Sequence, residues 1–285
     1  MACRADVVVV GGDHRLLGVA EARLRRLDRL WSRFRPGSDV TRLNLAAGAP
    51  VPVAPETLLL LERSVAAWRA SGGAFDPTLL PALVAAGDVA SRDDPAARTA
   101  LPPDARWPGD PGGITTARDT GEARLPRGTA LDPGGLGKGL AADLVVGELL
   151  AGGARGALVS VGGDLRVAGT APRGAWSVAV EDPHDRARPR AVLALADGGV
   201  ATSAPAARRW RHHGDDRHHL LSPTTGRPST APVASATVAA ATAAEAEALA
   251  KVPYALGPVA AAVALDAAGV AAVVVGEDGS ATATG

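Results

Sequence analysis

The segment from residue 131 to residue 143 constrains this chain most, because it places an acid, a glycine-rich turn and a lysine directly before an apolar stretch. Its sequence is Leu-Asp-Pro-Gly-Gly-Leu-Gly-Lys-Gly-Leu-Ala-Ala-Asp. Glycines let the backbone approach a ligand closely, and the free N–H groups at a helix start favour a phosphate oxygen. Residues 134–139 are therefore a candidate cradle for a pyrophosphate, with Lys138 as its counter-charge. An ordinary loop-to-helix joint explains the same residues equally well, so the rest of the chain must decide.

Two common phosphate-binding motifs do not fit this segment. A Walker loop needs a glycine where Asp132 stands and a Ser or Thr after the lysine, where Gly139 follows. The dinucleotide fingerprint needs another glycine spacing and a βαβ unit with a ribose-binding acid, and neither is present around this segment. We therefore expect a nucleotide site of a different kind.

The charge balance and the single cysteine narrow the class of protein. The chain has 285 residues, of which 47% are hydrophobic, and a formal net charge of zero. This length suffices for one large domain or two closely joined ones, and we expect a single domain over residues 1–285. A balanced charge argues against nucleic acid as a partner. Cys3 is the sole cysteine, which excludes an intramolecular disulfide.

The apolar stretches are too short for a membrane span. None approaches the roughly 18 apolar residues that a transmembrane helix needs. The first residues also lack the charged region and following apolar run of a signal peptide. We therefore expect no transmembrane segment and a cytoplasmic location.

Apolar residues recur at three- and four-residue steps in two N-terminal segments, which predicts two amphipathic helices. The first follows a short apolar strand at residues 7–10 and covers residues 17–34, and the second begins after Pro55. Trp31 and Trp68 lie on the apolar faces of these helices, so we interpret both as packing residues.

The second half of the chain alternates short apolar strands with turns and helices. Residues 85–130 are rich in Pro, Asp, Arg and Gly and predict a loop-rich connection, with faint strand signals around Ile114 and Leu125. One helix begins near Leu136, and another covers residues 243–251 and stops before Pro253. The expected strands are residues 157–161, 165–168, 176–180, 191–196, 233–238 and, as the final one, 270–275. The mixture predicts an α+β fold with mixed or antiparallel strand layers and flanking helices.

Several short motifs follow one another in an order that composition does not generate. They are Ser32-Arg33-Phe34-Arg35-Pro36-Gly37-Ser38 with Arg42-Leu43-Asn44, Gly72-Gly73-Ala74-Phe75-Asp76-Pro77-Thr78, the segment at 131–139, Val161-Gly162-Gly163-Asp164, Ala201-Thr202-Ser203, and the stretch His219-Leu220-Leu221-Ser222-Pro223-Thr224-Thr225-Gly226-Arg227-Pro228. In this order and spacing the chain resembles the ApbE family, the FAD:protein FMN transferases, from about Val7 to its C-terminus.

The resemblance implies a T-fold-like α+β architecture and an enzyme of flavin trafficking. Such an enzyme binds FAD and, with Mg²⁺, moves FMN onto a Ser or Thr hydroxyl of an acceptor protein and releases AMP. Its acceptor carries the motif Asp-x-x-Ser/Thr-Gly-Ala-Ser/Thr. Some relatives instead hydrolyse FAD to FMN and AMP.

The resemblance also implies roles for individual residues. His219 stands where the base for the acceptor hydroxyl is expected. The Gly135 carbonyl and Glu247 stand near the metal. The residues expected to contact FAD are Phe34, Ala74, Phe75, Asp76, Asp132, Lys138 and Leu221.

The chemistry of the residues agrees with these roles. Splitting a pyrophosphate requires charge neutralisation, in-line positioning and an acceptor for the nucleophile's proton. A neutral imidazole with an ordinary pKa of about 6.5 suits the last task, although His219 also lies in a histidine-rich stretch that reads as a solvated loop or an adventitious metal site. An aspartate before a proline is also typical of a turn, which is an alternative role for Asp76. The two glycines at positions 72 and 73 favour a role in the flavin site. Asp164 follows two glycines, so we interpret it as a hairpin-turn residue.

The largest departure from the family pattern affects the metal. Relatives have Ala-Asp-Ala-Leu-Ala-Thr on a late helix, where the Asp and Thr ligate Mg²⁺; here residues 246–251 read Ala-Glu-Ala-Leu-Ala-Lys. Glu247 retains a carboxylate. Lys251 cannot ligate, because an ammonium has no lone pair and repels a divalent ion. Three interpretations stay open: the lysine replaces part of the metal's charge, metal binding and transfer are impaired, or the side chain extends into solvent.

Two further departures concern the flavin region. Ser222 replaces the aspartate that usually follows the two apolar residues after the histidine, which lowers the expected basicity of His219. The Met-Gly-Thr element that opens most relatives does not precede the first strand. These departures touch the flavin and metal region, so we expect FAD binding to be retained and transfer to be weakened. The competing hypotheses are a flavin-binding protein without transferase activity and a Mg²⁺-dependent FAD pyrophosphatase.

Overall fold

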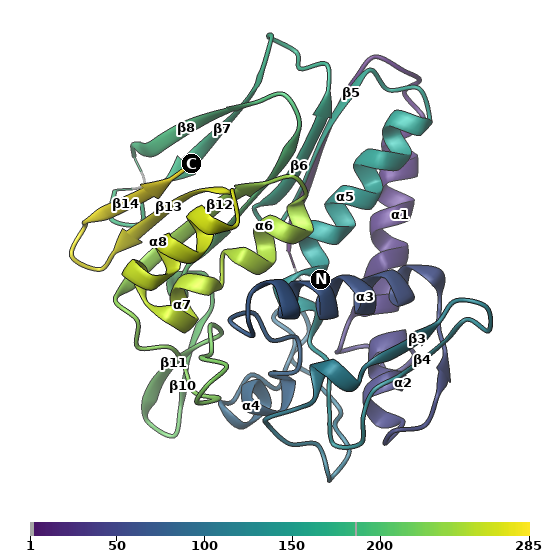
Figure 1. Ribbon diagram of the computed structural model, residues 1–285. Coiled ribbons are helices and arrows are strands. Elements are labelled where there is room, and N and C mark those ends of the chain that lie inside the picture. The colour runs from purple at the N-terminus through teal and green to yellow at the C-terminus, as the bar shows by residue number, and fades with distance from the viewer. Residues whose placement is uncertain (1–2, 186) are drawn as a thin grey trace. The chain divides into compact units, whose positions relative to one another are not determined.

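The computed structural model describes residues 3–185 and 187–285. The chain forms two compact units, and most of their helices and strands are labelled in Figure 1. Unit 1 contains Arg26–Gly137 and Pro205–Thr230, and unit 2 contains Cys3–Arg25, Lys138–Ala204 and Ala231–Gly285. The expected single domain over residues 1–285 stays a prediction.

Unit 2 is built on a 7-stranded sheet with the order β1-β5-β6-β9-β12-β13-β14. Each neighbouring pair in this sheet is antiparallel. Buried and partly exposed positions alternate along residues 157–161, as expected for a half-buried strand. The strands are β1 Ala5–Val10, β5 Gly156–Val161, β6 Asp164–Gly169, β9 Gly198–Ser203, β12 Val233–Ala240, β13 Ala271–Gly276 and β14 Ala281–Thr284.

Helices and a separate hairpin complete unit 2. Helix α6 (Ala243–Leu249) packs against β9 and β12, and α8 (Pro258–Ala267) packs against β13. Between them lies the short α7 (Val252–Leu256). Helix α5 (Gly137–Ala151) belongs to unit 2 from Lys138 onward and buries apolar side chains along its length. The hairpin pairs β7 (Trp176–Glu181) with β8 (Pro189–Leu195).

Unit 1 is mainly helical. Helix α1 (Leu16–Trp31) runs into it from unit 2, followed by α2 (Asp39–Leu45), α3 (Pro55–Ala70) and α4 (Leu80–Ala85). Its strands are short: β2 Val51–Pro52, β4 Glu122–Arg124 and β3 Thr115–Ala117 form one small sheet, and β10 Arg209–His212 pairs with β11 Asp215–His218. The 3₁₀ turns are η1 Pro111–Gly113, η2 Pro133–Gly135 and η3 Pro205–Ala207.

A buried carboxylate joins two helices of unit 1. Asp39, in the first turn of α2, accepts hydrogen bonds from the Ala54 N–H (2.8 Å) and the Thr57 hydroxyl (2.7 Å) at the start of α3. Ser38 caps α2 by accepting from the Thr41 N–H at 3.0 Å. These contacts fix the chain directly after the motif that carries Phe34.

Most sequence expectations for the fold are confirmed, including the α+β class with antiparallel strand layers and flanking helices. Trp31 is buried as expected, whereas Trp68 is half-buried. Two corrections concern strands. β13 is not the final strand, because β14 follows it. The apolar pattern does not predict the hairpin β10–β11, since most of its residues are charged and half of them are exposed.

In the described part of the chain, no helix is both long enough and apolar enough to cross a membrane.

Candidate functional site

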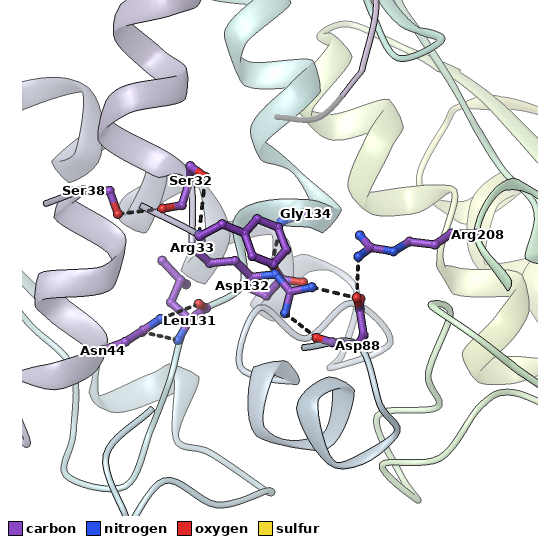
Figure 2. A network of polar contacts seen from close by, with 10 residues as sticks. Ser32, Arg33, Ser38, Asn44, Asp88, Leu131, Asp132, Gly134 and Arg208 are labelled. Carbon is purple, nitrogen blue, oxygen red and sulfur yellow. Dashed lines mark hydrogen bonds and ion pairs between the residues drawn. The ribbon is translucent and has the colours of Figure 1, made fainter. Parts of the chain in front are cut away.

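The side-chain amide of Asn44 connects two of the predicted motifs in unit 1 by hydrogen bonds. The amide of Asn44 in α2 accepts from the Leu131 N–H at 2.7 Å and donates to the Leu131 carbonyl at 3.0 Å. Figure 2 shows this pair of contacts beside Asp132. Asn44 is buried, so both halves of its amide need partners there, and Leu131 supplies them. The motif that ends at Asn44 and the glycine-rich segment are therefore held side by side.

A backbone hydrogen bond holds a third motif, at residues 72–78, beside the glycine-rich segment. The Asp132 N–H donates to the Pro77 carbonyl at 2.8 Å. One residue earlier, the Asp76 carboxylate accepts from the Thr78 N–H (2.7 Å) and hydroxyl (2.6 Å). The turn role that the sequence allows for Asp76 is thus present. Phe75 and Ala74 are buried just before it.

Phe34 and Asp132 both lie beside the buried guanidinium of Arg33. The Arg33 Cζ atom is 4.6 Å from the centroid of the Phe34 ring, a distance at which a cation and an aromatic face attract. The Arg33 Nε atom is 3.8 Å from Asp132 Oδ1. Asp132 also caps η2 by accepting from the Gly134 N–H at 3.2 Å, and Gly135 ends that turn. Phe34 and Asp132, two of the predicted flavin contacts, therefore both lie next to the Arg33 guanidinium.

The opposite end of Arg33 is bound by Asp88, a buried residue outside every predicted motif. Asp88 Oδ2 accepts from Arg33 Nη2 at 2.9 Å, and Asp88 Oδ1 accepts from Arg208. Figure 2 shows the carboxylate between the two guanidinium groups. Burial raises the pKa of the Asp88 carboxyl, partly opposed by the two arginines, and burial lowers the pKa of Arg208.

His219 follows β11 and is fixed by the main chain of Arg208. The Arg208 carbonyl accepts from the His219 backbone N–H at 3.3 Å and lies 3.3 Å from His219 Nδ1. A carbonyl oxygen can only accept, so Nδ1 carries the hydrogen and the neutral ring has its lone pair on Nε2. The Arg208 backbone thus orients the His219 imidazole without the aspartate that Ser222 replaces.

Leu221 lies two residues further on, in a small apolar cluster. It packs with Ala82, Leu83, Leu79 and Trp107. The following turn is closed because the Ser222 N–H donates to the Arg227 carbonyl at 2.8 Å. Unit 1 therefore holds most of the predicted site residues, namely Phe34, Ala74, Phe75, Asp76, Asp132, Gly135, His219 and Leu221.

Unit 2 holds the other two, Lys138 and Glu247, in direct contact. The Lys138 side chain is about a quarter exposed, and its ammonium donates to both Glu247 and Asp164. Burial alone would lower the pKa of Lys138, but the two carboxylates outweigh it and hold this pKa above its ordinary value. Burial raises the pKa of the Glu247 carboxyl, opposed by the neighbouring Lys138. The sequence interpretation of Asp164 as a turn residue accounts for its position but not for this ion pair.

The starts of α5 and α6 are in tight contact, which positions Glu247. The Gly139 N–H donates to Glu247 Oε2 at 2.7 Å. A Cβ on Gly139 would lie 2.2 Å from the Ala243 carbonyl oxygen, so only glycine fits. Asp143, one turn later on α5, accepts from the Ala243 and Ala244 N–H groups at 2.8 and 2.9 Å. This carboxylate caps the first turn of α6.

Lys251 points back to Glu247 rather than into solvent. Its ammonium donates to the Glu247 carbonyl at 2.6 Å and lies 3.8 Å from Glu247 Oε1. Within unit 2, two ammonium groups and two carboxylates, those of Asp164 and Glu247, thus balance each other. Among residues 3–185 and 187–285, no group of three or more His, Cys, Asp and Glu side chains is arranged to hold a metal ion. The donor set here does not fit a divalent cation.

Comparison with known proteins places these features in one family. The model of the ApbE family matches residues 1–274. A FAD:protein FMN transferase of Treponema pallidum is 30% identical over 250 residues, covering 82% of this chain and 69% of that relative. The ApbE protein of Thermotoga maritima has a similar fold, with a TM-score of 0.84 at 24% identity over 99% of this chain and 94% of that one. The flavinyl transferase ApbE of Pseudomonas stutzeri gives a TM-score of 0.79 at 26% identity, with the same two coverages. By sequence and by fold, this chain belongs to the ApbE family.

Proposed function

We propose that the protein is a FAD:protein FMN transferase. The observation that carries the proposal is the assembly of three separate motifs in unit 1, through the Asn44–Leu131 and Pro77–Asp132 hydrogen bonds. Such assembly is what a binding site built from distant segments requires, and the family membership supports the activity.

Each predicted residue then has a chemical task. Phe34, which is half-buried, offers an aromatic face to the flavin. Ala74, Phe75 and Leu221 are buried and support the wall of the flavin site from within the core. Asp76 and Asp132 offer carboxylate oxygens to its polar groups. Lys138, six positions after Asp132 in the glycine-rich segment, neutralises charge on the pyrophosphate, as a lysine commonly does.

The reaction needs one proton acceptor. The acceptor hydroxyl oxygen forms a bond to the phosphorus of the FMN half, and the bond from that phosphorus to the AMP oxygen breaks. His219 takes the hydroxyl proton on Nε2, and AMP leaves with the bonding electrons. The hydrogen bond from Nδ1 to the Arg208 carbonyl supports this role, because it fixes the tautomer that has its lone pair on Nε2.

Magnesium at Glu247 and the Gly135 carbonyl stays a prediction that rests on the family resemblance. When bound, a divalent ion supplies charge neutralisation at the pyrophosphate. The arrangement around Glu247 argues against it, because Lys138 and the Gly139 N–H already bind the carboxylate and Lys251 binds the carbonyl. Two ammonium groups beside the carboxylate would oppose a divalent ion, because like charges repel.

The acceptor is proposed to be a protein with the Ser/Thr motif Asp-x-x-Ser/Thr-Gly-Ala-Ser/Thr. No nucleic acid is expected to take part, since the chain has a formal net charge of zero. The cytoplasmic location stays a prediction from the sequence.

One assay tests the proposed function. The protein is incubated with FAD, Mg²⁺ and a domain that bears the acceptor motif, and the acceptor is examined for covalent flavin fluorescence on a denaturing gel while AMP is quantified. We expect a labelled acceptor and one AMP per label. Free FMN with AMP and an unlabelled acceptor would instead identify a pyrophosphatase, and intact FAD with bound flavin would identify a binding protein. A parallel reaction with EDTA measures the metal requirement.

A further inference from the structure

Asp88 connects the segment around Arg33 with the segment around Arg208, both of which the proposed function uses. Asp88 itself lies in neither segment. It lies after α4, and its side chain is 5% exposed. Its carboxylate oxygens bind different arginines, Oδ2 to Arg33 and Oδ1 to Arg208, and its carbonyl accepts from Arg33 Nη1 at 3.3 Å. The residue is thus a buried bridge between two cations, as Figure 2 shows.

On one side of the bridge, Arg33 orients the predicted flavin contacts. Its guanidinium lies 4.6 Å from the Phe34 ring centroid and 3.8 Å from Asp132 Oδ1. Because Arg33 is itself buried, the Asp88 carboxylate decides where this guanidinium is held. A change at Asp88 therefore moves the cation on which both flavin contacts depend.

On the other side, Arg208 orients His219 through its main chain. The Arg208 carbonyl receives both the backbone N–H and the Nδ1–H of His219. The Arg208 side chain is anchored on Asp88, so the same residue that binds the carboxylate presents the carbonyl to the imidazole. The placement and the tautomer of the base therefore depend on a contact to Asp88.

A purely structural role explains this bridge poorly. Buried ion pairs carry a heavy desolvation cost and often stabilise a fold no better than well-packed apolar residues do. We infer that Asp88 is a positioning residue of the proposed transferase, which through Arg33 and Arg208 holds the flavin contacts and the Nε2 base of His219 in one arrangement. The inference rests on the proposed function of His219.

The test compares Asp88→Asn with Asp104→Asn. The control removes the same charge from unit 1, but Asp104 pairs with the exposed Arg127. Long-range ¹H–¹⁵N spectra of the imidazoles report which ring nitrogen carries the hydrogen, and His219→Gln identifies the signals of His219. We expect the wild-type protein and Asp104→Asn to show Nδ1 protonated in the neutral ring. Asp88→Asn should show a mixture of tautomers.

Kinetics give the second readout. Asp88→Asn should lower kcat for FMN transfer by about 100-fold, the loss typical of a misplaced reactive group, with a smaller change in the KM for FAD. Asp104→Asn should change neither. Unchanged spectra together with unchanged kcat in a folded Asp88→Asn protein would overturn the inference.

Arg208 supplies variants that keep the Arg33–Asp88 pair, which matters if Asp88→Asn does not fold. Arg208→Gln should reproduce the mixed tautomers and the loss of kcat, and Arg208→Lys should restore much of both, because a lysine can still pair with Asp88. Equal behaviour of the two variants would contradict the proposed role. The spectra read the tautomer without turnover, so a wild-type protein that lacks transferase activity would refute the proposed function and still leave the positioning of His219 measured.

Discussion

The Gly139 N–H donates to the buried carboxylate of Glu247 across 2.7 Å, which joins the first turn of α5 to the middle of α6. The contact is possible because Gly139 has no Cβ; one placed there would lie 2.2 Å from the Ala243 carbonyl oxygen. A single glycine thus sets how closely two helices approach where Lys138 meets Glu247.

Gly139→Ala should destabilise the protein. The added methyl group overlaps backbone atoms, which cannot rotate away as a side chain can, and overpacking of this kind typically costs about 1–3 kcal/mol. Gly147→Ala, in the same helix, is the matched control: a Cβ there meets nothing within 4 Å, and the better helix propensity of alanine should stabilise by up to about 1 kcal/mol. Urea unfolding measures both. Equal unfolding midpoints for the two variants would contradict the tight contact.

The double change Lys251→Thr and Glu247→Asp should create binding of a divalent ion. It removes an ammonium that lies 3.8 Å from Glu247 Oε1 and adds a hydroxyl oxygen, a ligand that hard cations accept. Mn²⁺ titration followed by electron paramagnetic resonance should show a bound fraction in the variant and little in the wild-type protein. Lys251→Met separates removal of the charge from addition of the ligand. Tight Mn²⁺ binding by the wild-type protein would contradict this prediction. It would show that Lys138 and Lys251 can move away from Glu247 to admit a metal ion.

His219→Gln should abolish transfer while FAD still binds. The amide cannot accept the acceptor's proton, so kcat should fall by about 100- to 10,000-fold, the range for loss of a general base. Calorimetric titration of FAD into the variant should give a Kd within a few-fold of wild type. Retained transfer would assign the base to another residue.

Glu62 gives the stability of unit 1 a pH dependence with a defined sign. Hydrogen bonds from the Arg118 guanidinium hold the pKa of the Glu62 carboxyl below its usual range. The folded protein therefore binds this proton less readily than the unfolded chain, so the stabilisation is present above the unfolded pKa of about 4.3 and is lost as the pH falls through the lowered value.

Glu62→Gln should accordingly unfold more easily than wild type at neutral pH, and the two should converge in acid. Urea midpoints at several pH values measure the difference, which should be small because Arg118 is exposed, and should shrink further in 1 M salt. A difference that does not change with pH would reject the ion pair as its source.

The sequence predicts what depends on local pattern. Apolar spacing predicts α1 and α3, and the glycine-rich segment predicts the start of α5, because these signals lie within a few residues of one another. The motifs also name Asp132 and His219, which the structure links through Arg33, Asp88 and Arg208.

Asp88, Asp164 and the orientation of Lys251 depend instead on long-range packing. Asp88 follows α4 in a stretch without a motif, yet it meets an arginine 120 positions later. Asp164 looks like a turn residue until the pairing of β5 with β6 brings it to Lys138. Lys251 is long enough to reach solvent, yet its ammonium turns inward and donates to the Glu247 carbonyl, a contact that the sequence pattern does not reveal.

The cap that Asp143 places on α6 has a consequence for how this protein can vary. Asp143 and Gly139 lie about one turn apart on α5, and both engage α6, so the two helices interlock at two successive points. A single residue inserted between them would rotate the aspartate by about 100° and disengage one point or the other. We therefore expect the spacing between Gly139 and Asp143 to tolerate substitutions but no insertion or deletion.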